Sequence, residues 1–206
     1  MMQVSDGRAG AAVQGVTNCG AGPDSAIFRS RKMASGFCLA KTVSFAIRHI
    51  YVSAGHNFYG RYGQPADTHG VTEVSRVRCR AGWGLEGDRF YGYRPGYRGQ
   101  ATFFGWETVL AARRKFRSPR LAAGVFRRNI ITEGIDLNTL IGRRFTLEGV
   151  EFEGTEESRP CHWMNGCVAA GAEDWLRGQG GLRARVLSDG EIGVGSFELR
   201  LFQEVE

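Results

Sequence analysis

One stretch of the sequence predicts a β-hairpin, and it reads Phe145-Thr146-Leu147-Glu148-Gly149-Val150-Glu151-Phe152. Apolar and polar residues alternate on both sides of Glu148-Gly149, as they do in strands with one buried face. A two-residue turn there places Leu147 opposite Val150 and Phe145 opposite Phe152. All four apolar side chains then share one face, so the register agrees with the pattern.

Further strands are predicted on both sides of this hairpin. Residues 47–52 form an apolar run that leads into a polar, glycine-rich loop at 55–70, and residues 71–79 form a weaker strand candidate. A second hairpin is expected at Asp189-Gly190, which would bring Leu187 opposite Ile192. Residues 197–201 alternate between apolar and polar, which is typical of a half-buried strand.

Two short helices are expected between the strands. Residues 106–116 place their apolar side chains on one helical face, with Glu107 in the first turn and basic residues at the end, as the helix dipole favours. Residues 168–176 predict a second helix, with Asn165 as its cap and Gly178 as its end.

These elements predict a mainly β fold, an antiparallel β-barrel with a few short helical inserts. The chain has 206 residues and 30 glycines, about twice the usual share, which favours turns over long helices. Regular β-α-β alternation is lacking, which argues against a dinucleotide-binding fold. There is no run of 18 apolar residues, so no membrane span is expected.

Residues 1–44 are expected to form a poorly ordered extension before a barrel domain at residues 45–206. The extension is rich in Gly, Ala and Ser without periodicity. Met33 precedes the first credible apolar segment, and we expect the stretch 37–50 to supply the first strand. A chain starting at Met33 is therefore expected to fold.

Charge and cysteine content restrict the function classes. The net charge is +6, but residues 1–44 hold five basic and two acidic side chains, which is half of the excess. The remaining bias suits a small anionic ligand, and we expect no nucleic acid and no membrane partner. Five cysteines without paired spacing, and no secretory pattern, predict a reducing, cytoplasmic location.

Cys161 is the first candidate functional residue. It follows the hairpin and precedes the second predicted helix, so rigid elements hold its connection at both ends. Arg159 and His162 flank the sulfur, and nearby positive charge favours the thiolate, which is the form that attacks and that binds metal.

Two further clusters predict anion binding. Arg127 and Arg128 precede Asn129 and an apolar strand, and arginine binds phosphate or carboxylate through two parallel hydrogen bonds. Strand alternation would send one arginine towards the core and the other to solvent. The loop Gly84-Leu85-Glu86-Gly87-Asp88 can expose backbone N–H groups that cradle an anion, with Gly87 and Asp88 at its end.

The order and spacing of these clusters resemble the MOSC domain, a module found in molybdenum cofactor sulfurases, in amidoxime-reducing components and as small bacterial proteins. The resemblance covers about residues 71–202. It is carried by Gly84 to Asp88, Arg128 to Leu137, Gly142 and Phe145, Pro160-Cys161, Gly180 to Leu187, and Gly190-Glu191-Ile192.

The resemblance implies a β-barrel that binds the molybdenum–pyranopterin cofactor. It implies Cys161 as metal ligand and catalytic residue, and Arg128 and Asn129 as cofactor-binding residues, with Arg127, Asp88 and Gly87 beside them. The protein would be an oxidoreductase acting on N-hydroxylated substrates, or a sulfur carrier through Cys161. The first function needs a separate electron-transfer protein, and the second a separate pyridoxal-phosphate desulfurase.

Three alternatives remain open from the residues. Cys161, His162 and Cys167, together with Cys79, are the residue types of a zinc site, although their spacing does not support one. Cys161 is also the residue type of a nucleophile in an enzyme without molybdenum, with His56 or His69 as its base. The basic helix end at residues 113–117 is a candidate nucleic-acid patch.

Overall fold

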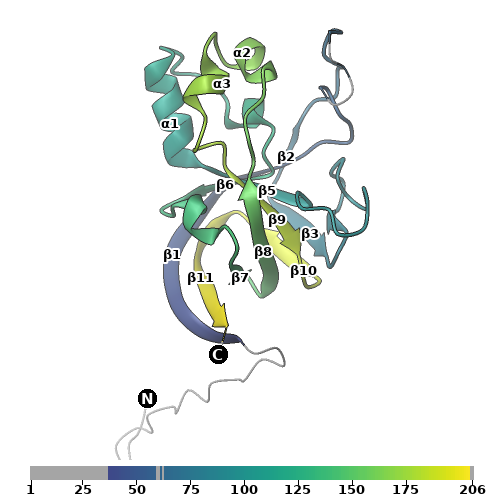
Figure 1. Ribbon diagram of the computed structural model, residues 1–206, viewed down its shortest axis with the longest axis vertical. Coiled ribbons are helices and arrows are strands. Elements are labelled where there is room, and N and C mark those ends of the chain that lie inside the picture. The colour runs from purple at the N-terminus through teal and green to yellow at the C-terminus, as the bar shows by residue number, and fades with distance from the viewer. Residues whose placement is uncertain (1–36, 59–60, 62, 205–206) are drawn as a thin grey trace, which may run out of the picture. The chain divides into compact units, whose positions relative to one another are not determined.

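The computed structural model describes residues 37–58, 61 and 63–204, and it shows a closed β-barrel with short helices at one end (Figure 1). Seven strands follow one another around the barrel in the order β11, β7, β8, β9, β5, β6, β1, and β1 pairs back with β11. Their bounds are β1 Phe37–Val52, β5 Ala101–Gly105, β6 Ile130–Glu133, β7 Arg144–Leu147, β8 Val150–Glu157, β9 Leu182–Val186 and β11 Gly195–Glu204. The predicted mainly β barrel is confirmed.

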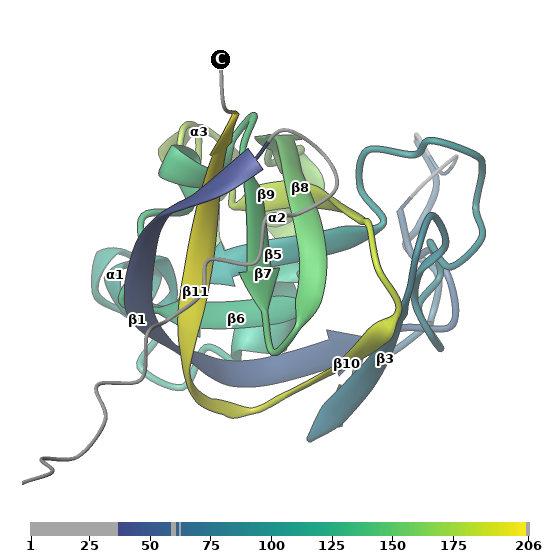
Figure 2. The ribbon, with the colours of Figure 1, turned by 90° about the horizontal axis from the view of Figure 1, so that it is seen from below.

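Strand β1 closes the barrel because its two parts pair with different neighbouring strands (Figure 2). Its first part pairs with β11, from Phe37 opposite Glu204 to Ile47 opposite Gly195. Its second part pairs with β6 and with the short strand β2 (Thr72–Val74). The register shifts between Ile47 and His49, and such irregularities bend a strand, which a closed sheet requires.

The predicted hairpin of β7 and β8 is confirmed in its register. Phe145 lies opposite Phe152 and Leu147 opposite Val150, and all four side chains are fully buried. The rings of Phe145 and Phe152 stack with centroids 5.5 Å apart, and Phe103 of β5 meets both edge-on. These aromatic contacts fill the barrel interior.

The barrel is not purely antiparallel, which corrects the sequence prediction. β5 and β6 run parallel, with Phe103 opposite Ile130. The connection between them contains α1 (Trp106–Lys115) and the 3-10 helix η1 (Ala123–Phe126), and a crossover of this kind returns the chain in the same direction. The predicted helix at 106–116 is confirmed as α1.

The predicted second hairpin is wrong. β10 (Gly190–Gly193) pairs with β3 (Arg76–Arg80) rather than with β9, and β3 also pairs with β4 (Gly84–Leu85) in a separate three-stranded sheet. The Asp189 carboxylate accepts a hydrogen bond from the amide of Ala81 at 2.8 Å, which directs the turn towards β3. The amide of Leu187 instead donates to Glu151 of β8.

The candidate strand at 71–79 is divided. Its first part is β2, which pairs with β1, and its second part is β3, which pairs with β10. The two strands belong to different sheets, so the chain changes partner at Ser75.

The predicted helix at 168–176 is also divided. The structure has two separate short helices, α2 (Trp163–Cys167) and α3 (Ala172–Trp175), and Gly171 begins α3 in the left-handed region with φ of 80°. Asn165 does act as a cap, but across space, because its side-chain oxygen accepts from the amide of Glu173 at 3.0 Å. A further 3-10 helix, η2, spans Leu137–Leu140.

Beneath the helices lies a second group of buried side chains that joins them to the barrel. It includes Phe104 of β5, Phe126 of η1, Met164 of α2 and Leu176 after α3. We call this part of the molecule, where α1, α2 and α3 lie together in Figure 1, the helical end.

Strand β1 begins at Phe37, so the expected boundary at residue 44 falls within it, while the expectation that residues 37–50 supply the first strand agrees with its bounds. The backbone pairing with β11 accounts for this early start. Residues 1–36, including Met33, lie outside the described residues. Among the helices that the structure describes, none is long and apolar enough to cross a membrane.

Candidate functional site

Cys161 lies on the connection from β8 to α2 at the helical end, between a hairpin and a helix as predicted. Its side chain is exposed. The connection is fixed before the cysteine by the amide of Ser158, which donates to Gly181 at 2.8 Å, and after it by the amide of Met164, which donates to the Cys161 carbonyl at 2.9 Å. The thiol is therefore presented by a loop with anchored ends.

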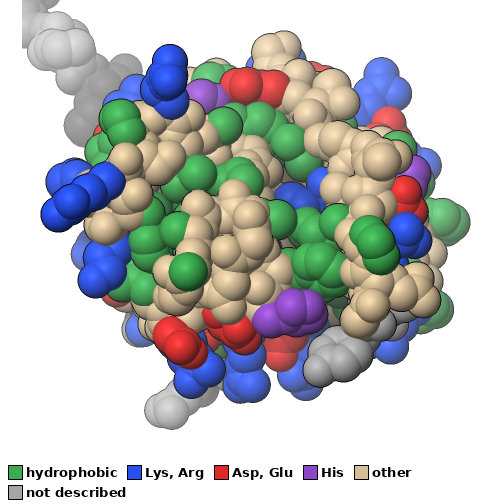
Figure 3. Space-filling view, turned by 90° about the horizontal axis from the view of Figure 1, so that it is seen from above, with side chains coloured by type: hydrophobic (Ala, Val, Ile, Leu, Met, Phe, Trp, Pro, Cys, Tyr) green, Lys and Arg blue, Asp and Glu red, His purple; other side chains and the backbone are tan. Residues whose placement is uncertain are grey.

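Cys161 borders a pocket of about 130 Å³ built from five segments of the chain. Its lining consists of His56, Asn57, Phe58, Arg89, Phe90, Phe126, Arg127, Arg128, Cys161 and Met164. Figure 3, which views the helical end, shows basic side chains inside a hollow rimmed by apolar ones. Three guanidinium groups and one thiol are the chemically distinctive members of this lining.

Arg128 is held entirely by main-chain carbonyls. Its Nε donates to Gly180 at 3.1 Å, its Nη1 to Phe126 at 3.0 Å and its Nη2 to Ser158 at 2.7 Å. Within the described residues it forms no ion pair, although it is largely desolvated. Burial lowers the pKa of Arg128 to about 10, helped by the positive charge of Arg183, while negative charge on Cys161 acts in the opposite direction. The guanidinium thus lacks a carboxylate counter-ion.

Arg127 is held in a similar way from the other side. Its Nη1 donates to His69 at 2.8 Å, and its Nη2 donates to Ser53 Oγ at 2.9 Å and to the Gly55 carbonyl at 3.0 Å. Its backbone is left-handed, with φ of 53°. Burial and the neighbouring charge of Arg89 lower the pKa of Arg127.

Arg89 completes the basic lining. Its Nη1 lies 3.3 Å from the carboxylate of Asp88, its Nη2 donates to the Arg127 carbonyl, and its guanidinium lies 4.9 Å from the ring centre of Phe90. The Asp88 side chain has no exposed surface. Within the part of the chain that the structure describes, Arg89 is therefore the one pocket arginine paired with a carboxylate, and that carboxylate is inaccessible to a ligand.

Asn129 and Asp88 bond to each other behind the pocket and are not part of its lining. Asn129 Nδ2 donates to Asp88 Oδ2 at 2.9 Å and to the Tyr51 carbonyl at 3.1 Å, and its Oδ1 accepts from the amide and the hydroxyl of Thr102. Asp88 also accepts from the amides of Ser53 and Phe90. Every polar atom of Asn129 is thus used inside the protein.

The structure therefore brings together three of the predicted site residues, Cys161, Arg127 and Arg128. Gly87, with φ of 81°, lies in the left-handed region and is not among the pocket residues. The expected alternation of the two arginines does not hold, since both border the pocket. The reason is that β6 begins only at Ile130, after the left-handed turn at Arg127.

Two polar pocket residues were missed from the sequence, Arg89 and Asn57, as were the pocket's apolar lining residues. Asn57 Oδ1 is buried and has no hydrogen-bond partner among the described residues, which marks a place for a donor from a ligand. A second pocket of about 430 Å³, which contains Cys167, shares Asn57, Phe58 and Arg127 with the first. His56, considered from the sequence as a base, borders the first pocket with Cys161.

The structure gives the zinc interpretation no support. In the part of the chain that it describes, no three His, Cys, Asp or Glu side chains gather into a metal site. Cys79 lies in the barrel core, and burial raises the pKa of its thiol to about 12. A thiol in that setting stays protonated and does not serve as a ligand.

Comparison with known proteins supports the resemblance. Residues 100–196 match the model of the MOSC domain. The YuaD protein from Bacillus subtilis is similar in structure, with a TM-score of 0.62 and 18% identity over 79% of this chain and 99% of that chain. YiiM from Escherichia coli is similar with a TM-score of 0.55 and 17% identity, over 79% of this chain and 70% of that one.

YiiM from Geobacillus stearothermophilus gives a TM-score of 0.56 and 19% identity, over 76% of this chain and 74% of that one. At these identities the structural likeness shows the fold. No curated protein sequence matches the chain. The family model and the barrel agree on one assignment: residues 100–196 of this chain match the MOSC domain.

Proposed function

We propose that this protein binds the molybdenum–pyranopterin cofactor in the Cys161 pocket. The observation that supports this proposal is the meeting of Arg89, Arg127 and Arg128 with an exposed thiol around one pocket. Arg127 and Arg128 form no ion pair within the described residues, and such uncompensated guanidinium groups at a pocket favour an anionic ligand. A thiolate is a soft ligand suited to a transition metal.

The residues present fit this group in three ways. Arg127 and Arg128 already use several N–H donors on backbone carbonyls, so their geometry is fixed before an anionic phosphate arrives. The orphaned acceptor Asn57 Oδ1 fits a flat ring that bears N–H groups, as a pterin does. Cys161 would hold the metal, and Phe58, Phe90 and Phe126 supply apolar walls to the pocket.

When bound, the cofactor supplies a metal that changes its oxidation state by two electrons. The chain's own residues then have two tasks. Arg128 supplies positive charge beside Cys161, and its bond to the Ser158 carbonyl fixes the loop that carries the thiol.

For the reaction we propose the reduction of N-hydroxylated substrates, in which two electrons and two protons convert the N–OH group into N–H and water. A sulfur-carrier role, with a persulfide on Cys161, uses the same exposed thiol. The first role requires a separate electron-transfer protein and the second a separate pyridoxal-phosphate desulfurase. We propose a reducing, cytoplasmic location, in keeping with the free thiols of Cys79, Cys161 and Cys167.

The direct test is metal and pterin analysis of protein purified from a host that makes the cofactor. We expect close to one molybdenum and one pterin per chain, and loss of molybdenum in Cys161→Ser with retained folding. Cys167→Ser is the matched control, because it changes a neighbouring thiol that does not border the smaller pocket. Folded wild-type protein without molybdenum, prepared where the cofactor is plentiful, would contradict the proposal.

A second candidate function is favoured by one observation, the presence of His56 and Cys161 on the same pocket. Burial, followed by the charge of Arg89, lowers the pKa of His56, so the imidazole is neutral at pH 7 and can accept a proton. Cys161 would then be the nucleophile of an enzyme without molybdenum. The two candidate functions are distinguished by measuring the rate of Cys161 alkylation as a function of pH. The His56→Gln change should shift this pH dependence only if His56 is the base for Cys161.

A further inference from the structure

A basic surface lies at the C-terminal end of α1, and no function is assigned to it above. It consists of Arg113, Arg114, Lys115, Arg117 and Arg120, of which all but Arg113 are exposed. We call it the α1 basic surface. We propose that it docks the acidic face of a separate carrier protein that serves the Cys161 pocket. The partner's role rests on the proposed function, whereas the docking itself does not.

The charge of this surface is not neutralised by any ion pair within the described part of the chain. From Thr108 to Thr132 the sequence holds seven arginines and lysines and no aspartate or glutamate. None of the five basic residues of the surface forms an ion pair with the rest of the described chain. On the two sheets, by contrast, arginines such as Arg76, Arg183 and Arg185 pair with glutamates across strands. The positive charge of the α1 basic surface is therefore available to interact with an external partner.

The local structure holds these side chains around a shallow groove. Arg113 donates to the Leu121 carbonyl at 3.0 Å and lies over the Trp106 ring at 4.9 Å, which fixes the loop after the helix. A groove of about 500 Å³ lies between Leu110, Arg113, Arg114, Arg117 and Pro119. An acidic side chain of a partner entering this groove would meet guanidinium groups on several sides.

The surface and the Cys161 pocket belong to the same end of the molecule. The rings of Phe116, after α1, and Trp175, in α3, meet edge-on with centroids 5.4 Å apart. Phe116 and Met164, a pocket residue, pack into one buried cluster. Figure 1 shows α1 beside α2 and α3, and Figure 3 shows basic side chains along the rim of this end. A partner on the α1 basic surface would therefore sit beside the pocket.

A protein is favoured over a nucleic acid or a membrane. Phe116 packs against Trp175 and is not free to stack on a base, as single-strand binding requires. The large hydrophobic side chains exposed in the described chain are Trp83, Tyr93, Ile141 and Val194, and none is on this surface, so it lacks apolar anchors for a bilayer. A compact positive patch suits the fast, transient encounter that a carrier protein makes.

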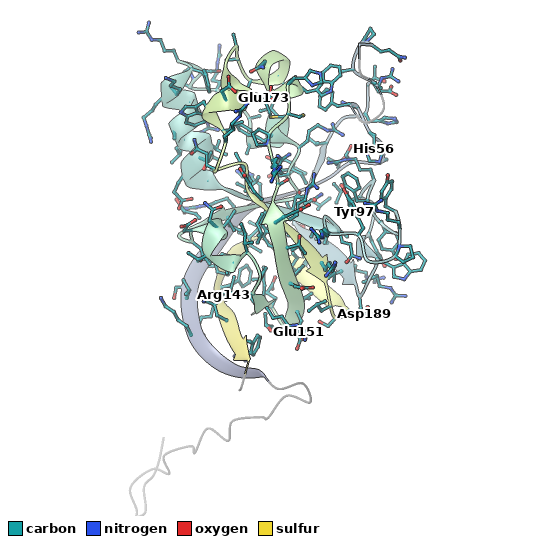
Figure 4. All side chains as sticks on the ribbon, viewed as in Figure 1. His56, Tyr97, Arg143, Glu151, Glu173 and Asp189 are labelled. Carbon is teal, nitrogen blue, oxygen red and sulfur yellow. The ribbon has the colours of Figure 1, made fainter. Side chains whose placement is uncertain are left out.

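The test compares two double charge reversals. Arg114→Glu with Arg117→Glu changes the α1 basic surface. Arg143→Glu with Arg200→Glu is the matched control, since both arginines are exposed and form no ion pair in the described chain. Figure 4 shows Arg143 on the barrel, well below the helical end marked by Glu173. Both variants change the net charge equally, so non-specific attraction falls equally.

The probes are purified flavodoxin as a small acidic carrier protein, a 20-base-pair DNA duplex and anionic phospholipid vesicles. We expect flavodoxin binding at 50 mM salt to weaken at least tenfold in the α1 variant, to stay near the wild-type value in the control, and to be lost at 0.5 M salt. Equal binding by both variants overturns the inference. So does absence of flavodoxin binding to the wild type, or tighter binding of DNA or vesicles.

Binding is measured on protein with and without molybdenum. If the wild-type protein never acquires molybdenum but still binds flavodoxin, the cofactor proposal fails and the proposed docking surface stands. Molybdenum-loaded protein that does not dock flavodoxin overturns this inference alone.

Discussion

Asn129 Nδ2 donates to Asp88 Oδ2 across 2.9 Å in the protein interior. Arg127 and Arg128 immediately precede Asn129, and Arg89 immediately follows Asp88. The bond therefore joins, from behind, the two segments that supply all three guanidinium groups of the pocket. It sets the spacing of those groups without contacting a ligand in the pocket.

Replacing Asn129 by Ala should destabilise the fold. The change removes one of the hydrogen bonds to the buried Asp88 carboxylate, together with the Asn129 bonds to the Tyr51 carbonyl and the Thr102 amide, and we expect a loss of about 2–4 kcal/mol in the free energy of unfolding. Urea denaturation measures it. Asn138→Ala, which removes an exposed bond to Gly178, should cost under about 1 kcal/mol. Full stability of Asn129→Ala combined with lost cofactor would instead indicate direct contact with the ligand.

Lysine should not replace arginine at position 128. One ammonium group does not reach three carbonyls that lie in different directions around a guanidinium, so at least one of the bonds to Gly180, Phe126 and Ser158 is lost. We expect Arg128→Lys to lower the free energy of unfolding by about 1–3 kcal/mol. It should also speed proteolysis after Ser158. The exposed Arg159→Lys is the control, and equal behaviour of the two variants would contradict an anchoring role for Arg128.

The described cysteines should react with iodoacetamide in a fixed order. Cys161 is exposed and should react first, and Cys167 should follow, because burial raises its pKa. Cys79 should stay unmodified at pH 8, because burial raises its pKa to about 12. Mass spectrometry of the alkylated peptides gives the order. In 6 M guanidinium the three rates should converge, and rapid native modification of Cys79 would show that the barrel opens there.

Stability should fall below pH 6.5 because of His56. Burial and the charges of Arg89 and Arg127 lower its pKa, against a smaller opposing effect of Asp88. Between the ordinary value of 6.5 and the lowered value, the unfolded chain binds a proton that the folded chain does not, so stability decreases as the pH falls. His56→Gln should flatten this slope in thermal unfolding between pH 7 and 5. An unchanged slope in His56→Gln would assign the effect to other groups.

The successful sequence predictions were those decided by neighbouring residues. The hairpin at Glu148-Gly149 needs only a turn and two alternating strands, and its register is correct. Asp189-Gly190 has an equally clear turn signal, yet β10 pairs with β3, more than 100 residues away. Alternation describes which face is buried and contains no information about the partner strand.

The site shows the same limit. Cys161, Arg127 and Arg128 could be predicted as site residues because their side chains have distinctive chemistry. Asn57 could not, because it reaches the pocket from a loop whose path depends on tertiary contacts. Asn129 and Asp88 are polar residues of the types that bind ligands, but each satisfies the other. Whether a polar side chain faces a ligand or another side chain depends on distances between segments, which a single sequence does not give.

The pairing of β1 with β11 has a consequence for biosynthesis. Ile47 and Gly195 are partners about 150 residues apart, so the first strand of the barrel leaves the ribosome long before its neighbour exists. At translation rates of about 5–20 residues per second, that interval lasts roughly 7–30 s. During it, the edge of β1 that β11 later covers is open to pairing with other nascent chains. Chaperones that shield this segment should therefore matter more for the yield of active protein than the stability of the finished barrel.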